Sequence, residues 1–354
     1  MNENTANTSA PGPVRFQAAC ADGVLAGWRW PNEGAPPLLF CHATGFCASV
    51  YKQMLQHLSG RFDVFALDMR GHGRTRLVAD PEGLRSWKVY ADDVAEFLNH
   101  EARSGWTLAG HSMGGVVVAM AARGRSDVAA MALIEPVAMP PAMRLAARTP
   151  IWPFMARRFT LVRLARRRRS QWPARADVAV GYGRKPVFRN WAPGVLDDYL
   201  EDGLADDNEG VRLACTPAWE AATFQAHDND FWGAVRAAPA PVRVLAANHK
   251  SSTVWRHARR RFERIGAPVA LQAGVSHLIA MEMRWKGPIW RLNSSQASNT
   301  RLKSRPLAIE GLEAASLFAK RAAKFHDGRL GTTDAVDVER QKGLPWLRRS
   351  NRRN

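Results

Sequence analysis

A serine between two glycines is the first feature of the sequence that could carry out chemistry. The segment Gly110-His-Ser-Met-Gly114 follows a β-type run that starts at Trp106 and precedes small apolar residues that end at Ala122. A serine on a tight strand-to-helix turn has a strained backbone, so glycine is needed two positions before and after it. Such a turn exposes the Ser112 hydroxyl at a helix start, where the Met113 backbone N–H can stabilise an oxyanion. Short G-x-S-x-G matches arise by chance, but the flanking patterns make this serine a candidate nucleophile.

A serine hydroxyl needs a positioned base, usually a histidine that a carboxylate orients. Among ten histidines, His277 follows the last predicted strand in the segment Gly274-Val-Ser-His-Leu-Ile-Ala-Met-Glu282. A loop there lies on the same edge of a parallel sheet as Ser112, so we predict that His277 is the base. The alternative for His277 is a structural role, in which it caps a helix or packs at a helix start. His249 also follows a strand and is the rival base, whereas His111 and His72 adjoin glycine-rich turns and are expected to be structural.

No organic cofactor or metal is expected from the sequence. It contains no dinucleotide-binding or phosphate-binding glycine loop, and its His, Asp and Glu residues lack metal-ligand spacing. Four cysteines without a CxxC pair are typical of reduced, buried thiols. The longest clean apolar run, residues 116–122, is far too short for a membrane span, and residues 1–13 lack a signal pattern. These features predict a soluble cytoplasmic protein.

The order of predicted elements indicates an α/β fold. Apolar β-type runs at residues 37–41, 64–67, 107–109 and 131–134 are separated by segments of helical period such as 54–58 and 89–99. Strand character returns at 242–246 and 269–272, with a helical segment at 253–264 between them. This alternation predicts a mainly parallel sheet flanked by helices.

Strand patterns stop between residues 136 and 237, where prolines separate short amphipathic pieces. We therefore predict a flexible N-terminus (1–13), an α/β core (14–137 and 238–283), a helical cap or lid (138–237) and an atypical basic C-terminal extension (284–354). The extension is expected to be partly disordered, with one helix at 312–325 and a polar tail from 331.

The formal net charge of +18 is unevenly distributed. Residues 1–137 sum to −1, 138–237 to +4, 238–285 to +6 and 286–354 to +9, and together these give +18. Without a nucleic-acid-reading motif, we rank a nucleic-acid binder lowest and expect no nucleic-acid partner. The arginines at 157–169 favour a solvated basic face, with anionic substrates or an acidic membrane surface as the alternatives.

Four blocks resemble the α/β-hydrolase fold of serine esterases and lipases. Residues 39–46 (LFCHATGF) resemble the oxyanion loop, 65–75 (FALDMRGHGRT) a characteristic turn, 110–115 (GHSMGG) the nucleophile elbow, and Ser276-His277 the catalytic-histidine loop. The resemblance covers about residues 14–283. It implies that Ser112 is the nucleophile, His277 the general base, and the N–H groups of Met113 and Thr44 the oxyanion hole.

The acid of a triad is less obvious in this chain. Families of this fold place it after the strand at 242–246, but Asn248, His249 and Lys250 occur there. The alternative position is the end of the preceding strand, where Met131-Ala-Leu-Ile-Glu-Pro136 presents Glu135. We assign Glu135 as the acid. The family pattern also ends after Glu282, where a closing helix is usual.

The resemblance implies hydrolysis of an ester or related acyl bond of a small, partly hydrophobic molecule through an acyl-serine intermediate. A catalytically impaired binding or regulatory protein, a carbon–carbon-bond hydrolase and a haloperoxidase-like enzyme remain the alternatives. The sequence leaves the oligomeric state open. The cap is expected to cover the serine with an apolar acyl pocket made of Met143, Trp152, Phe154, Met155, Phe159 and Trp172.

Overall fold

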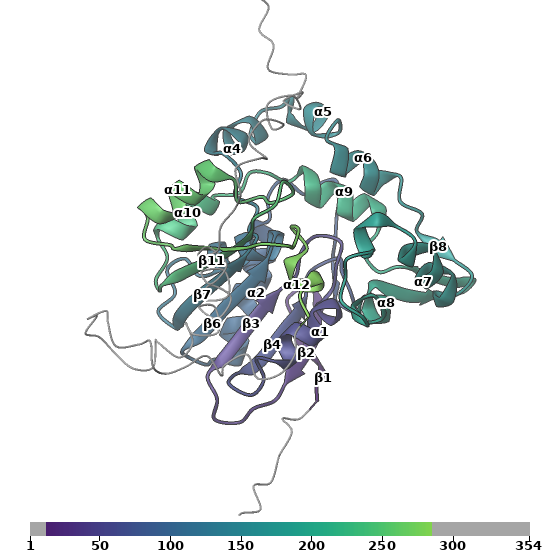
Figure 1. Cartoon of the computed structure of the whole chain (residues 1–354), viewed down its shortest axis with the longest axis horizontal. Coiled ribbons are helices and arrows are strands. Elements are labelled where there is room, and N and C mark those ends of the chain that lie inside the picture. The colour runs from purple at the N-terminus through teal and green to yellow at the C-terminus, as the bar shows by residue number, and fades with distance from the viewer. Residues whose placement is uncertain (1–11, 285–354) are drawn as a thin grey trace, which may run out of the picture.

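The computed structural model describes residues 12–284, which form a central sheet with helices on both faces and a further group of helices at one end of it (Figure 1). In this range the central sheet has nine strands in the order β1-β2-β4-β3-β6-β7-β11-β12, with β5 paired to β2. The strands are β1 (Val14–Cys20), β2 (Gly23–Trp30), β3 (Pro37–Cys41), β4 (Asp63–Asp68), β5 (Arg76–Leu77), β6 (Trp106–His111), β7 (Val128–Ile134), β11 (Val242–Ala247) and β12 (Val269–Gln272).

Every neighbouring pair from β4 to β12 in this order is parallel, whereas β1, β2 and β5 pair antiparallel. The predicted mainly parallel sheet is therefore confirmed. The antiparallel hairpin of β1 and β2 was not predicted, because β1 buries only Ala18 and so has no apolar run.

Helices cover both faces of the central sheet, and the sheet separates two apolar clusters. Alternate residues of β3 point to opposite faces: Leu39 and Cys41 belong to one cluster, Leu38 and Phe40 to the other. Apart from Trp219 in the first cluster and Val178 and Tyr182 in the second, which come from helices described below, four helices pack in the first cluster and four helical elements in the second. The first four are α2 (Lys88–Glu101), α3 (Met113–Ala121), α10 (Phe231–Arg236) and α11 (Arg256–Arg264); the second four are the 3-10 helix η1 (Ala48–Tyr51), α1 (Lys52–Gln56), α8 (Val195–Gly203) and α12 (Ile279–Glu282).

We use the word cap for residues 138–230, which are the part of the predicted cap (138–237) before the start of α10. Its helices lie at one end of the sheet (Figure 1). Besides α8, they are α4 (Pro141–Ala147), α5 (Trp152–Ala156), α6 (Thr160–Arg166), α7 (Arg175–Gly183), α9 (Pro217–Gln225) and the 3-10 helix η2 (Pro186–Phe188). The cap also contains β8 (Gln171–Trp172), β9 (Leu204–Asp207) and β10 (Gly210–Leu213), which form a second sheet in the order β8-β10-β9. The prediction that strands stop in this segment is therefore wrong, because strands of two to four residues leave no apolar period.

Three further predictions concern membrane helices, the cysteines and the two terminal segments. No helix of residues 12–284 is long and apolar enough to cross a membrane; the cytoplasmic location stays a prediction. All four cysteines are free, and Cys41, Cys47 and Cys215 are buried, but Cys20 is only half-buried, contrary to the expectation. The predicted N-terminal segment up to residue 11, the extension from residue 285 and the helix at 312–325 lie outside the described residues.

Candidate active site

Three polar side chains from distant parts of the sequence meet at one edge of the central sheet. Ser112 follows β6, Glu135 follows β7, and His277 lies in the loop after β12. These strands are parallel to their neighbours in the order β6-β7-β11-β12, so their carboxyl ends share this edge. The structure thus brings together the three residues that the sequence analysis assigned to a triad.

The turn between β6 and α3 holds Ser112 in an unusual backbone conformation. Its φ and ψ angles are 56° and −114°, a region that side chains rarely adopt. A Cβ atom on Gly110 would lie 2.4 Å from the backbone of Gly114, and one on Gly114 would lie 2.2 Å from the carbonyl oxygen of Cys41. Glycine is therefore required at both positions because two backbones pass in contact there. This is the physical reason for the G-x-S-x-G spacing.

His277 connects the serine to the carboxylate. Its Nε2 atom lies 3.0 Å from Ser112 Oγ, and its Nδ1 atom lies 2.9 Å from Glu135 Oε2. If Nδ1–H donates to the carboxylate, Nε2 is free to accept the serine proton. The Ser112 residue is 7% exposed, so little solvent reaches this hydrogen bond.

Glu135 is fully buried and is surrounded by donors. Its own backbone has a φ of 46°, and its N–H donates to the carbonyl of Leu245 in β11 at 2.7 Å. Apart from His277, its carboxylate accepts hydrogen bonds from Ala247 N–H (2.5 Å), the Ser252 hydroxyl (2.7 Å) and Thr253 N–H (2.9 Å). Burial alone would raise the pKa of Glu135, but the hydrogen bond and charge of His277, with the bonds from Ser252 and Thr253, hold it below its ordinary value. The side chain is therefore an anion at neutral pH.

Other side chains fix the histidine loop. Ser251 Oγ accepts a hydrogen bond from His277 N–H at 2.9 Å. Glu282 accepts hydrogen bonds from the backbone N–H and the hydroxyl of Ser276, at 2.6 and 2.5 Å. Sequence reasoning did not assign a role to Ser251 or Glu282. The signal for Ser251 was the polar run Ser251-Ser252-Thr253, which follows the positions where the family acid was sought.

His111, the residue before Ser112, belongs to the same hydrogen-bond network. Its Nε2 lies 2.9 Å from the His277 carbonyl oxygen, which can only accept, so Nε2 carries the proton. Its Nδ1 then accepts from the Tyr51 hydroxyl at 2.8 Å, and Tyr51 in turn accepts from Ala43 N–H at 3.1 Å. Burial and the charge of His277 lower the pKa of His111 to about 3, so it stays neutral. Tyr51 was not identified from the sequence.

The two predicted oxyanion donors lie where β3 ends and α3 begins. Met113 is the first residue of α3, so its N–H has no acceptor within the helix. Thr44 lies in the loop after β3, and its hydroxyl lies 3.3 Å from Met113 Sδ. Among residues 12–284, neither backbone N–H donates to a protein acceptor, whereas the neighbouring Gly45 N–H donates to His72 Nε2 at 3.1 Å. Two unpaired amides at this point can bind an oxyanion.

His72 and His42 support this loop. His72 Nδ1 lies 2.9 Å from the Arg70 carbonyl oxygen, and burial lowers the pKa of His72 to about 4. His42 accepts from Met69 N–H at 2.9 Å, and burial holds its pKa well below the ordinary value. Both rings are therefore neutral. The rival base His249 is exposed, and its Nδ1 lies 2.8 Å from Ser251 Oγ instead of near Ser112.

The predicted apolar acyl pocket is wrong in its residues. Phe154 and Met155 are 69% and 46% exposed, so they line no enclosed pocket. Trp152 packs on Phe159, with ring centroids 5.5 Å apart, in a small cluster that includes Met143. Trp172 packs on Tyr182 at 6.1 Å, in the cluster on the other side of the sheet. A helical period shows which residues share a face, but not what that face covers.

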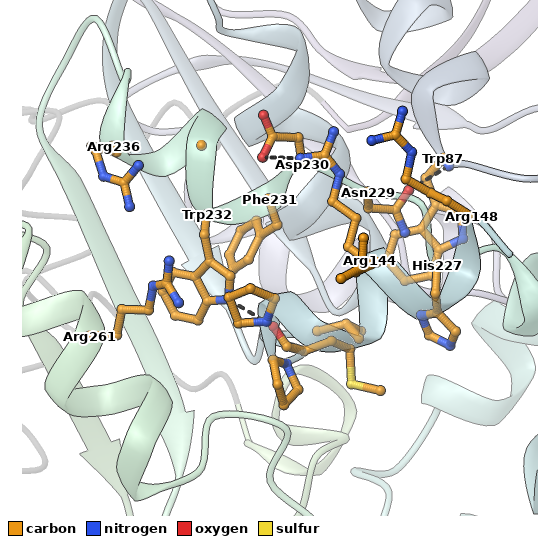
Figure 2. Close-up of a pocket in the computed structure, with 16 residues that line it drawn as sticks. Trp87, Arg144, Arg148, His227, Asn229, Asp230, Phe231, Trp232, Arg236 and Arg261 are labelled. Carbon is orange, nitrogen blue, oxygen red and sulfur yellow. Dashed lines mark hydrogen bonds and ion pairs between the residues drawn. The ribbon is translucent and has the colours of Figure 1, made fainter.

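A pocket of about 340 Å³ lies where the cap leaves the core (Figure 2). Val137, Pro140, Trp232 and several arginines line it. Arg144 lies against Asp230 at 2.9 Å. Ser112, Glu135 and His277 are not among its lining residues.

Within the described part of the chain, no group of His, Cys, Asp and Glu side chains could hold a metal ion.

Comparisons with known proteins find similar sequences over part of the chain. A 2-(acetamidomethylene)succinate hydrolase from Mesorhizobium japonicum is 38% identical over 84 residues, which are 23% of this chain and 29% of that protein. A bifunctional esterase/perhydrolase from Acinetobacter calcoaceticus is 37% identical over 125 residues, 34% of this chain and 44% of that protein. The chain thus matches less than half the length of these curated relatives.

Solved structures share the fold over a longer range. The crystal structure of an E-2-(acetamidomethylene)succinate hydrolase matches with a TM-score of 0.62 and 23% identity, over 76% of this chain and 94% of that one. The model of the alpha/beta hydrolase family matches residues 38–286, more than half of the 354 residues. With its parallel sheet and the strained serine turn after β6, the chain belongs to the alpha/beta hydrolase family.

Proposed function

We propose that this protein hydrolyses an ester or related acyl bond of a small molecule through an acyl-serine intermediate. One observation carries the proposal: Ser112 Oγ, His277 and Glu135 form a continuous hydrogen-bonded chain with spacings of 3.0 and 2.9 Å. The names of similar proteins, hydrolases of substituted succinates and an esterase/perhydrolase, support acyl chemistry.

The residues suggest a two-step reaction. Ser112 Oγ attacks the carbonyl carbon while His277 Nε2 takes its proton, and the Glu135 carboxylate stabilises the imidazolium. The N–H groups of Met113 and Thr44 stabilise the oxyanion, and His277 then protonates the leaving group as the acyl-serine forms. Water attacks that intermediate with His277 again as the base, and this step releases the acid and restores Ser112.

The alternative of a binding protein that has lost turnover rests on Asn248 at the usual acid position and on the atypical C-terminal extension. Asn248 is exposed, and its N–H donates to the Gln272 carbonyl at 2.8 Å. Because Glu135 fills the role of acid from the end of β7, Asn248 is no sign of a lost triad. The geometry therefore favours the enzyme.

Covalent labelling tests the proposal. We expect a fluorophosphonate probe to modify Ser112 in the wild type, and Ser112→Ala to abolish both the labelling and the hydrolysis of 4-nitrophenyl acetate. Ser126→Ala replaces an exposed serine outside the site and should change neither. Hydrolysis that persists at the wild-type rate in Ser112→Ala would remove the serine from the mechanism.

A further inference from the structure

One arginine of the cap is turned toward the proposed oxyanion loop. Arg166, Arg167 and Arg169 are exposed, whereas the Arg168 side chain is only 23% exposed. A Cβ atom built on Gly45 would lie 2.4 Å from Glu220 Oε1 and 3.5 Å from Arg168 Nη1, so the Glu220–Arg168 ion pair lies against this loop. Gly45 directly follows Thr44, and adjacent Cα atoms are about 3.8 Å apart. The guanidinium therefore lies close to the residue that follows a proposed oxyanion donor.

Arg168 keeps donors to spare. Its Nη1 donates to Glu220 Oε2 at 2.7 Å, and its Nη2 donates to the hydroxyls of Tyr182 and Tyr199 at 3.0 and 3.2 Å. A guanidinium has five N–H donors. Within residues 12–284, the Nε–H and the second Nη1–H of Arg168 have no protein acceptor.

The charge around this arginine is positive overall. Glu220 is the carboxylate paired with Arg168 in the described residues. The Nζ atom of Lys185 lies 4.1 Å from the centroid of the Tyr182 ring, which Arg168 also contacts. Two cations thus stand against one anion, so a further anion can be accepted here without an excess of negative charge.

Trp191 provides an independent sign of a missing acceptor. Its residue is 8% exposed, and its Nε1–H is buried without a hydrogen-bond partner. An indole N–H can only donate, and leaving it buried and unpaired costs free energy. The Trp191 ring packs 5.7 Å from Phe46 of the oxyanion loop and 6.3 Å from Tyr199, which pairs with Arg168.

The position of Trp191 is fixed relative to His277. The next residue, Ala192, donates its N–H to the carbonyl of Met281 at 2.8 Å, and Met281 lies in α12, which follows His277. Trp191 therefore packs on a residue of the oxyanion loop and adjoins a residue that is bonded to α12, the helix after His277.

We infer that Arg168 and Trp191 bind a carboxylate group of the substrate. The substrate class is then an acyl compound that carries a carboxylate on its acyl part, such as a half-ester of a dicarboxylic acid. A planar guanidinium suits a carboxylate, because it can donate two parallel hydrogen bonds. This inference rests on the proposed function.

A matched pair of substrates tests the inference. Mono-4-nitrophenyl succinate carries the carboxylate, and 4-nitrophenyl levulinate replaces it by an uncharged acetyl group of the same shape. We expect wild-type kcat/KM to be at least tenfold higher on the succinate. Arg168→Met should lower kcat/KM on the succinate by about 100-fold, and at least tenfold more than on the levulinate. Arg168→Lys keeps the charge without the fork and should recover part of the loss.

Further variants separate recognition from folding. Arg168→Met leaves Glu220 without its partner, so Arg168→Met/Glu220→Gln removes both charges and should lose the preference for the succinate in the same way. Trp191→Phe, which removes only the indole N–H, should weaken that preference by about tenfold. Arg167→Met changes an exposed neighbour and should leave both rates unchanged.

The outcomes distinguish the two proposals. Fluorophosphonate labelling of Ser112 without any preference for the succinate, or an equal loss on both substrates in Arg168→Met/Glu220→Gln, would overturn the carboxylate site alone. A preference for a carboxylate on the alcohol part, tested with 4-carboxyphenyl butyrate against phenyl butyrate, would also overturn it. Absence of labelling and of hydrolysis in the wild type would overturn the proposed function, and the carboxylate site with it.

Discussion

The sheet edge and the cap differ in how completely their side chains are covered. At the edge, Ser112 and Glu135 are buried and every polar atom of the Glu135 carboxylate is paired. In the cap, large apolar side chains are open to solvent: it holds eight of the eleven exposed large apolar residues in the described range. They are Leu145, Ile151, Phe154, Met155, Leu161, Leu164, Val180 and Val187.

This contrast follows from the two kinds of support. Ser112 and Glu135 follow β6 and β7, which are hydrogen-bonded to neighbouring strands on both sides, so the strained backbones of these two residues can persist. Cap helices of five to nine residues cannot be stable by themselves and depend on the few faces that they bury. We infer that the edge fixes the chemistry, while selectivity resides in the few cap residues that turn inward, such as Arg168 and Trp191.

The largest effect on activity is expected at Glu135, whose carboxylate oxygens are all hydrogen-bonded. Glu135→Gln replaces an anion by an amide whose NH₂ group would face the donors Ala247 N–H, Ser252 and Thr253 N–H. An uncharged side chain cannot stabilise the imidazolium, and a wrong histidine tautomer adds to the loss, so kcat should fall by about 10⁴-fold. Steady-state kinetics measure this, with the exposed Glu82→Gln as control. A loss below tenfold would show that Glu135 is not the acid.

The same substitution has a predictable effect on acid stability. The pKa of Glu135 in the folded protein lies below its ordinary value, so the unfolded chain binds the proton more readily. This carboxylate therefore stabilises the fold above the ordinary glutamate range, and that contribution is lost as the pH falls through the folded-state pKa. Denaturant titrations should show wild-type stability falling more steeply with acid than the stability of Glu135→Gln. Parallel curves would contradict the direction of the pKa shift.

A smaller but still large effect is expected at the turn that carries the serine. In Gly114→Ala, the new Cβ would lie 2.2 Å from the carbonyl oxygen of Cys41, so β3 and α3 must separate. We expect a loss of about 3 kcal/mol or more in the free energy of unfolding. Gly60→Ala is the control, because no atom lies within 4 Å of its new Cβ. Equal stabilities of the two variants, measured by urea denaturation, would mean that the backbones are not in contact.

Sequence reasoning recovers the sheet edge well, because the edge follows from local patterns. The apolar runs fix the parallel strands, and a parallel sheet then places Ser112, Glu135 and His277 on one side. The network through Tyr51 and His111 could not be predicted, since it joins residues whose spacing follows no local pattern.

The cap shows the limit of the same reasoning. In the run Arg166-Arg-Arg-Arg169, only Arg168 turns inward, and nothing in four identical residues distinguishes it. Phe154 was assigned to a pocket because it is apolar, yet it is exposed. Burial in the cap is decided by the partner surface, which a one-dimensional period does not contain.

Tyr51→Phe probes how far the order of the edge extends. Loss of the hydroxyl removes the donor to His111 Nδ1 and the acceptor of Ala43 N–H. His111 and the loop before Thr44 then lose one constraint each, so kcat should fall by about tenfold, the worth of one buried hydrogen bond. Tyr90→Phe is a matched control, because it removes a buried hydroxyl that pairs with Thr223 at 2.8 Å. If both variants lose stability equally but neither loses activity, Tyr51 has no positioning role.

The smallest effect is expected on the open face of the cap. Leu164 in α6 is 60% exposed, whereas Leu133 in β7 is fully buried. Leu164→Ala should change the free energy of unfolding by less than about 0.5 kcal/mol, because the leucine side chain buries little apolar surface in the folded protein. The same truncation at Leu133 should cost about 2–5 kcal/mol.

Urea denaturation of the wild type and Leu164→Ala at two protein concentrations tests whether the open face of the cap is exposed in solution. A concentration-independent loss above 1 kcal/mol in Leu164→Ala would show that another part of the same chain covers this face. A loss that grows with concentration would instead show that a second copy covers it, since only association makes stability depend on concentration. In either case the contrast between a covered edge and an open cap would no longer hold. Arg168 would then not be distinguished from the other cap side chains by being covered.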